Sequence, residues 1–141
     1  MPYSGIPNLQ KGWEVVKASG CENAMLILDT WHWVRANQPY DILTPEIAEK
    51  VISIQINDAY ERPYADSILR DESMHDRLAP GTGIGTTVPF VKMIREKGIK
   101  PNAIGVEVIS DANLEKGIEY AAKHTYENTK KVLEEAWPEV L

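Results

Sequence analysis

The sequence has few of the features that mark secreted or membrane proteins. Its single cysteine, Cys21, excludes an internal disulfide and is typical of a small buried or half-buried side chain in a reducing compartment. No apolar run reaches the roughly 18 residues that a membrane-spanning helix needs, and residues 1–5 lack the charged start and apolar stretch of a signal peptide. These absences predict a soluble cytoplasmic protein without a membrane partner.

The sequence also lacks a basic patch. It has 15 Lys and Arg residues against 21 Asp and Glu residues, a net charge of −6 at pH 7, and neither sign forms a long block. Because an acidic surface repels phosphate backbones, this balance argues against nucleic acid as a partner. We find no internal repeat and no low-complexity segment.

The composition is that of an ordinary globular domain. Hydrophobic residues make up 43% and charged residues 26% of the 141 residues, enough for one domain with a sizeable core over residues 1–141. A complete (β/α)8 barrel typically needs about 250 residues, so this chain is well short of one.

Hydrophobic periodicity and capping residues predict helices that alternate with strands. Strands are expected at residues 25–28, 51–58 and 103–108. Helices are expected at residues 8–19, 44–50, 86–97 and 112–137. Strands separated by helices pair in parallel through right-handed crossovers. The predicted fold is therefore α/β, with a parallel βαβαβ unit and flanking helices.

The connection over residues 58–85 is unusually long and has little periodicity. Such loops inside compact domains are either disordered or functional, often as lids over a site. It contains Pro80-Gly81-Thr82-Gly83, but no strand precedes this run and no Gly-Lys-Ser/Thr follows it, so it is a weak signal for phosphate binding.

Polar side chains stand near the carboxyl end of each predicted strand. They are Asp29, with His32 three residues later, Gln55 or Asp58, and Glu107. Because parallel strands end at one edge of the sheet, these groups should converge there. Two carboxylates and a neutral oxygen donor suit a hard divalent cation such as Mg²⁺ or Mn²⁺, whose other ligands would come from elsewhere.

Each of these residues also has a purely structural interpretation. In this interpretation Asp29 only caps the next segment, with His32 exposed beside it, and Gln55 belongs to a hydrogen-bonded interior. Asp58 suits a cap of the turn after the second strand better than a ligand. Glu107 is harder to explain in this way, because a carboxylate in an apolar strand is rarely buried unless it is paired or coordinated.

Four motifs together resemble the xylose-isomerase-like TIM barrels, a family of sugar phosphate isomerases and epimerases. They are Leu28-Asp29-Thr30-Trp31-His32 with Arg35, Ile54-Gln55-Ile56-Asn57-Asp58-Ala59, His75-Asp76-Arg77-Leu78-Ala79-Pro80-Gly81-Thr82-Gly83, and Val106-Glu107-Val108. The similarity in order and spacing spans essentially the whole chain. It implies a partial (β/α)8 barrel that corresponds to about strands six to eight.

The resemblance implies a Mn²⁺ or Mg²⁺ ion at the barrel mouth, held in this family by Glu, Asp, His and Glu. Asp29 and Glu107 match the second and fourth of these ligands. Gln55 stands where most members have the histidine, and some relatives in the dehydroshikimate dehydratase branch also have glutamine there. The implied metal ligands are therefore Asp29, Gln55 and Glu107.

The resemblance also implies the residues that act on the substrate, a sugar, cyclitol or similar polyhydroxy carbonyl compound. Glu107 would carry protons, and His32 would join it in catalysis. His32, His75 and Arg77 would contact the substrate. The implied reaction is an isomerisation or epimerisation next to a carbonyl group.

Residues 2–7 resemble the segment that follows strand five, so the first metal-binding glutamate and strands one to five would lie outside this chain. Three strands cannot close a barrel. We therefore expect the chain to be completed by a missing N-terminal half or by another copy of itself.

Two other functions remain open from the sequence. Gln55 favours a dehydroshikimate dehydratase-like lyase, and the missing glutamate favours a non-catalytic barrel fragment that binds a partner. Endonuclease relatives need more histidine ligands than the three histidines of this sequence, His32, His75 and His124.

Overall fold

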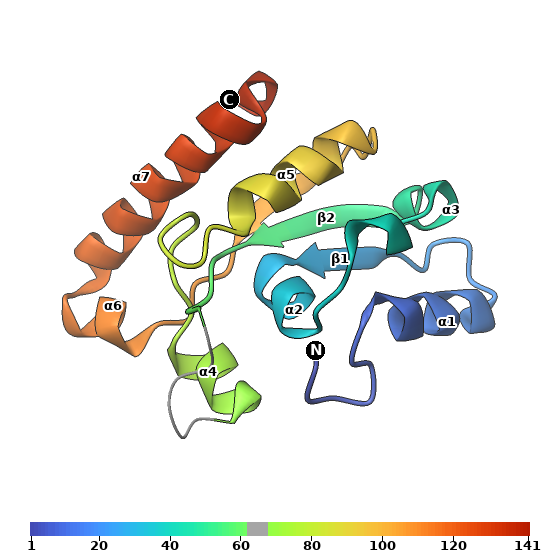
Figure 1. Cartoon of the computed structure of the whole chain (residues 1–141), viewed down its shortest axis with the longest axis horizontal. Helices are drawn as coiled ribbons and strands as arrows, with labels where there is room; N and C mark the ends of the chain where they lie inside the picture. The colour runs from blue at the N-terminus through green and yellow to red at the C-terminus, as the bar shows by residue number, and fades with distance from the viewer. Residues whose placement is uncertain (62–67) are drawn as a thin grey trace.

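The computed structural model describes residues 1–61 and 68–141, and its centre is a parallel three-stranded sheet. The strands β1 (Leu26–Asp29), β2 (Val51–Ile56) and β3 (Ala103–Val106) lie in the order β1-β2-β3. In Figure 1, α1 and α2 lie next to β1, and α7 lies on the far side of α5 from β2. The predicted α/β class and parallel pairing are confirmed.

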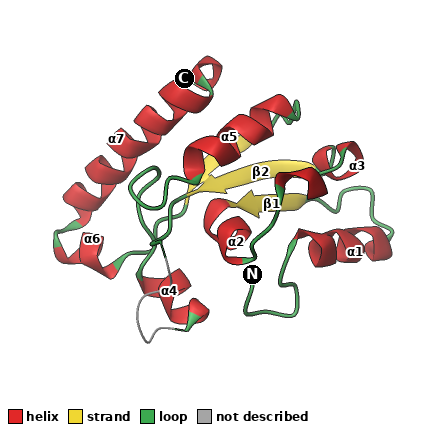
Figure 2. Cartoon of the chain, in the orientation of Figure 1, coloured by secondary structure: helices red, strands yellow, loops and turns green. Residues whose placement is uncertain are grey.

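The helices follow the predicted alternation and add short elements to it (Figure 2). They are α1 (Leu9–Ser19), α2 (Thr30–Arg35), α3 (Pro45–Ala48), α4 (Leu69–His75), α5 (Thr87–Glu96), α6 (Asp111–Glu115) and α7 (Ile118–Ala136), with 3-10 turns at Tyr40–Ile42 and Pro138–Val140. No helix among the described residues is long and apolar enough to cross a membrane.

The helix predicted at residues 8–19 is α1, with Asn8 as its N-cap and Ser19 as its last residue. The side chain of Asn8 accepts a hydrogen bond from the backbone N–H of Lys11, which satisfies one of the free donors of the first turn. Gly20 ends the helix with φ of 64°, a left-handed conformation that glycine adopts without steric cost. Cys21, which follows directly, is exposed, so the expectation of a buried or half-buried thiol is wrong.

The strand register separates a buried face of the sheet from an open one. Ile54 in β2 aligns with Leu28 in β1, and both are buried in one core with Phe90 of α5 and Leu133 of α7. On the opposite face, Ile27 of β1 is 59% exposed. Within the described residues, β1 and β3 each pair with β2 alone, so each has a free edge.

Three local features differ from the sequence-based expectation. Residues 30–35 form α2, and the long connection contains α4. Neither helix was predicted, because helices of six or seven residues show too little periodicity in the sequence. The predicted helix 112–137 is two helices, since Gly117 adopts φ of 95° between α6 and α7.

Ile54→Ala should test how far stability depends on the buried face. The side chain of Ile54 is fully buried in the central strand, so its truncation should lower the free energy of unfolding by about 2–5 kcal/mol. The matched variant Ile27→Ala removes the same atoms from the exposed face and should change it by about 0.5 kcal/mol at most. Urea unfolding followed by circular dichroism measures both, and equal losses would contradict the assignment of the two faces.

Candidate functional site

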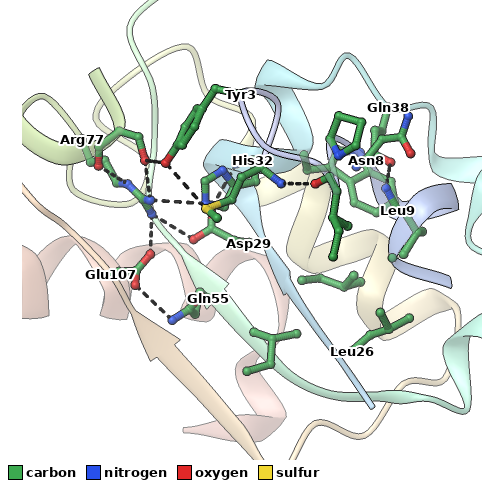
Figure 3. A pocket seen from close by; sticks show the side chains of 18 of the residues that line it. Tyr3, Asn8, Leu9, Leu26, Asp29, His32, Gln38, Gln55, Arg77 and Glu107 are labelled. Atoms are coloured by element: carbon green, nitrogen blue, oxygen red, sulfur yellow. Dashed lines mark hydrogen bonds and ion pairs between the residues drawn. The ribbon is translucent and has the colours of Figure 1, made fainter. Parts of the chain in front are cut away.

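A pocket of about 440 Å³ opens at the carboxyl end of the sheet (Figure 3). Five of the six predicted site residues line it, namely Asp29, His32, Gln55, Arg77 and Glu107. The N-terminal segment forms another wall, where the Tyr3 hydroxyl lies 3.1 Å from Ser73 Oγ of α4. The five side chains come from positions up to 78 residues apart in the sequence, Asp29 and Glu107 being the most distant pair.

Arg77 lies between the two carboxylates of the pocket, as Figure 3 shows. Its Nη1 donates to Asp29 Oδ2 at 3.0 Å and to Glu107 Oε2 at 2.6 Å. Its Nε donates to the backbone carbonyl of Ser73 and its Nη2 to Ser73 Oγ, both at 2.9 Å. Arg77 is only 3% exposed, so a buried cation joins the ends of two strands to α4.

Asp29 caps α2 and faces the pocket at the same time. Its Oδ1 accepts a hydrogen bond from the backbone N–H of His32 at 3.0 Å, which is the capping role that the sequence left open. Its Oδ2 accepts from Arg77 and from Asn57 Nδ2, the latter at 3.0 Å. Both oxygens of this buried carboxylate are therefore hydrogen-bonded.

Asn57 is a site residue that the sequence reasoning missed. It is fully buried, and its Nδ2 reaches both Asp29 and the backbone carbonyl of Glu107, the latter at 3.2 Å. Its Oδ1 accepts from the backbone N–H of Trp31 at 2.8 Å. The sequence signal for this role was its position, since Asn57 is an amide directly after a buried strand and the strands on both sides end in carboxylates.

Gln55 lies beside both carboxylates. It aligns with Asp29 across the β1 and β2 pair, and its Nε2 is 3.4 Å from Glu107 Oε1. The side chain of Glu107 is 38% exposed, in contrast to the buried Asp29. Glu107 is thus the carboxylate that faces the open space of the pocket.

His32 is held in its neutral form. Burial, followed in importance by the positive charge of Arg77, lowers the pKa of the His32 imidazole to about 4. Its Nε2 lies 3.4 Å from Arg77 Nη2, and its buried Nδ1 finds no hydrogen-bond partner among the described residues. Because Arg77 Nη2 can only donate, Nε2 is the acceptor nitrogen of the neutral ring and the N–H lies on the buried Nδ1.

A second buried ion pair, between Arg35 of α2 and Glu72 of α4, joins these two helices. Glu72 is fully buried and accepts from Arg35 Nε at 3.0 Å and from Trp31 Nε1 at 3.2 Å. Arg35 Nη2 also donates to Glu72 and to the backbone carbonyl of Tyr60. Arg35 belongs to one of the four sequence motifs, but the sequence does not identify Glu72 as its partner, because no periodic pattern connects α2 with α4.

His75 is the predicted site residue that the structure does not bring into the pocket. It is the last residue of α4, and its exposed ring pairs through Nδ1 with Asp111 Oδ2 at 3.0 Å. Ser73 and His75 project from different sides of α4. Ser73 bonds to Arg77, whereas His75 pairs with Asp111, the first residue of α6.

Two other candidates have structural roles. Asp58 is fully buried and accepts from the N–H of Ala59 at 2.9 Å, as expected of a turn cap. A Cβ on Gly83 would lie 2.1 Å from the Ala59 carbonyl oxygen, closer than any side chain can approach. This close approach of two backbones explains the glycine without a bound phosphate.

The parallel sheet, with its polar groups at the carboxyl ends of the strands, has the architecture of β/α barrel proteins. Residues 1–128 match the model of the xylose isomerase-like TIM barrel family, and the chain belongs to this family. This confirms the resemblance carried by the four sequence motifs and the interpretation of the fold as part of a barrel.

The chain is similar to an inosose isomerase of Halalkalibacterium halodurans, with 25% identity over 132 residues. This match covers 94% of the chain and 45% of the relative. The structure is similar to that of an IolI protein with a bound zinc atom, with a TM-score of 0.80 and 19% identity, over 96% of this chain and 47% of the other.

A further similar structure is a xylose isomerase domain protein from Alicyclobacillus acidocaldarius subsp. acidocaldarius. Its TM-score is 0.68 and its identity 26%, over 92% of this chain and 44% of the other. The chain therefore spans less than half the length of each of these relatives.

Glu72→Gln should test the buried ion pair behind α4. The variant leaves Arg35 buried without its counter-charge, so we expect the free energy of unfolding to fall by about 3–5 kcal/mol in urea unfolding. Glu139→Gln, which breaks the exposed pair with Arg95, serves as the control and should leave it almost unchanged. A similar small effect of both variants would contradict the structural role given to Glu72.

His32 should titrate near pH 4 rather than 6.5 in an NMR titration of the metal-free chain. Its folded-state pKa is lowered, so the unfolded chain binds more protons between these two values. The free energy of unfolding should therefore fall as the pH drops through this window. His32→Gln should weaken that part of the pH dependence, and a midpoint above 6 would contradict the burial of the ring beside Arg77.

Proposed function

We propose that this chain carries part of the active site of a divalent-metal-dependent isomerase or epimerase that acts on a sugar or cyclitol. The observation that carries the proposal is the convergence of Asp29, Gln55 and Glu107 on one pocket at the carboxyl end of the sheet. The inosose isomerase relative and the zinc-containing IolI structure support it.

The chemistry of the donor set fits a divalent cation. No cluster of three His, Cys, Asp or Glu side chains within the described residues is ready to hold a metal. However, Asp29 and Glu107 already bind one cation together, the Arg77 guanidinium. Together with the side-chain carbonyl of Gln55, the two carboxylates offer three oxygen ligands of the kind that Mn²⁺ and Mg²⁺ prefer. Water, substrate or another segment would have to complete the coordination shell of the metal.

A bound metal would polarise the substrate carbonyl and so make the neighbouring C–H group more acidic. Glu107, whose carboxylate faces the pocket, takes this proton as the C–H bond breaks and its electron pair moves toward the carbonyl oxygen. Return of the proton to the former carbonyl carbon, with transfer of the neighbouring hydroxyl proton to the former carbonyl oxygen, gives an isomer. Return to the opposite face of the original carbon gives an epimer. The second outcome needs another proton donor.

His32 and Arg77 bind and orient the substrate in this proposal. Both line the pocket next to Glu107, and Nε2 of the neutral His32 imidazole can accept a hydrogen bond from a substrate hydroxyl. Arg77 supplies positive charge where the carbonyl oxygen becomes negative. His75 binds substrate only if the end of α4 moves, since its ring now pairs with Asp111.

Gln55 favours a second candidate, a dehydroshikimate dehydratase-like lyase. Such an enzyme removes the same kind of proton, but the electron pair then expels a neighbouring hydroxyl, which leaves as water when the proton is passed to it. Mass analysis of the product distinguishes the two, because the lyase product is lighter than its substrate by one water, whereas an isomer has the same mass.

The free edges of β1 and β3 favour a third candidate, a non-catalytic half-barrel that binds a partner. The same edges would, in an active enzyme, receive the remaining barrel strands from an N-terminal half or from a second copy. Analytical ultracentrifugation of the chain alone measures whether it self-associates.

Calorimetric titration with Mn²⁺ tests the metal site. We expect the double variant Asp29→Asn, Glu107→Gln to lose at least a factor of about ten in affinity, because the amides that replace the carboxylates carry no charge for the cation. The control Asp41→Asn, Glu115→Gln changes the net charge equally at two exposed positions and should bind as the wild type does. Equally weak binding by all three proteins would contradict metal dependence.

A further inference from the structure

Arg77 uses the carboxylate oxygens that a metal would need. Asp29 Oδ2 accepts from Arg77 Nη1 and Asn57, while Asp29 Oδ1 caps α2. Glu107 Oε2 accepts from the same Nη1 at 2.6 Å. A divalent ion coordinates carboxylate oxygens directly at short distance, so at Asp29 Oδ2 and Glu107 Oε2 it competes with the guanidinium.

Charge leads to the same conclusion. Arg77 places one positive charge between two carboxylates, and its own side chain is only 3% exposed to solvent. A metal ion beside an unmoved guanidinium would face strong repulsion in this buried setting. Without either cation, the negative charges of Asp29 and Glu107 would face each other unpaired.

We propose that Arg77 and the divalent metal are alternative occupants of the Asp29 and Glu107 pair, so that metal binding displaces the guanidinium. This inference rests on the proposed function, because it assumes a metal at these carboxylates. Arg77 is then the site's own counter-cation in the metal-free protein.

The remaining contacts of Arg77 show where the guanidinium goes. Its Nε and Nη2 bond to Ser73 on α4, and its Cζ lies 5.5 Å from the ring centre of Trp31. None of these contacts involves a carboxylate. Because the guanidinium is planar, it must pivot to take Nη1 away from the carboxylates. Ser73 Oγ and the Trp31 ring can hold the pivoted group at the pocket wall beside His32, where Nη1 becomes free to bind a substrate oxygen. Metal binding would thus prepare the substrate site.

Arg77→Gln separates this exchange from a merely structural role of the arginine. In calorimetric titration with Mn²⁺, we expect the variant to bind at least about tenfold more tightly than the wild type, since no guanidinium competes for the carboxylates. The control Arg95→Gln also removes one positive charge, from an exposed surface pair with Glu139, and should leave the affinity unchanged.

Thermal unfolding of the same proteins gives a second readout. Without metal, Arg77→Gln should melt at a lower temperature than the wild type, because the two carboxylates lose their counter-cation. Saturating Mn²⁺ should raise the melting temperature of Arg77→Gln more than that of the wild type. A smaller rise in the variant would overturn the proposed exchange.

A measurement on the wild type keeps the test independent of how well the variant folds. In ¹⁵N-labelled protein titrated with Mg²⁺, the assigned Arg77 Nε–H signal should shift with the same Kd as that found by calorimetric titration with Mg²⁺. An unshifted signal at saturation overturns the exchange but leaves the metal-dependent function intact. Absence of binding by both the wild type and Arg77→Gln overturns both proposals.

Discussion

The pairing of one buried cation with two carboxylates determines how the polar half of this structure is arranged. Arg77 lies in the long connection after β2, Asp29 ends β1, and Glu107 follows β3. Buried charges are tolerated only when they are paired and hydrogen-bonded. The guanidinium therefore holds the connection over the carboxyl ends of two strands that do not touch each other.

The other buried polar groups support this arrangement. Asn57, at the end of the central strand, bridges Asp29 and the backbone at Glu107, so the three strand ends share one network. Arg35 and Glu72 form a second buried pair, and the two arginines lie on Trp31 at 5.8 and 5.5 Å from its ring centre. Such networks hold side chains in one geometry when every member is satisfied.

The apolar surface of the chain agrees with its similarity to two barrel proteins that are about twice as long. Ile27 on β1, Val106 on β3, and Ile118 and Tyr126 on α7 are exposed. Val106 and Tyr126 also line a shallow apolar groove between β3 and α7. These are the surfaces that further barrel units or a second copy would cover in the function proposed for this chain.

Local sequence determined the three strands, their parallel pairing, the caps of α1 and the convergence of Asp29, Gln55 and Glu107, because periodicity and strand-end position depend on neighbouring residues alone. Tertiary structure decided the formation of α2 and α4, the placement of Arg77 between the carboxylates, the roles of Asn57 and Glu72, and the exclusion of His75 from the pocket. These features depend on contacts between residues 28 to 50 positions apart, which no local pattern records.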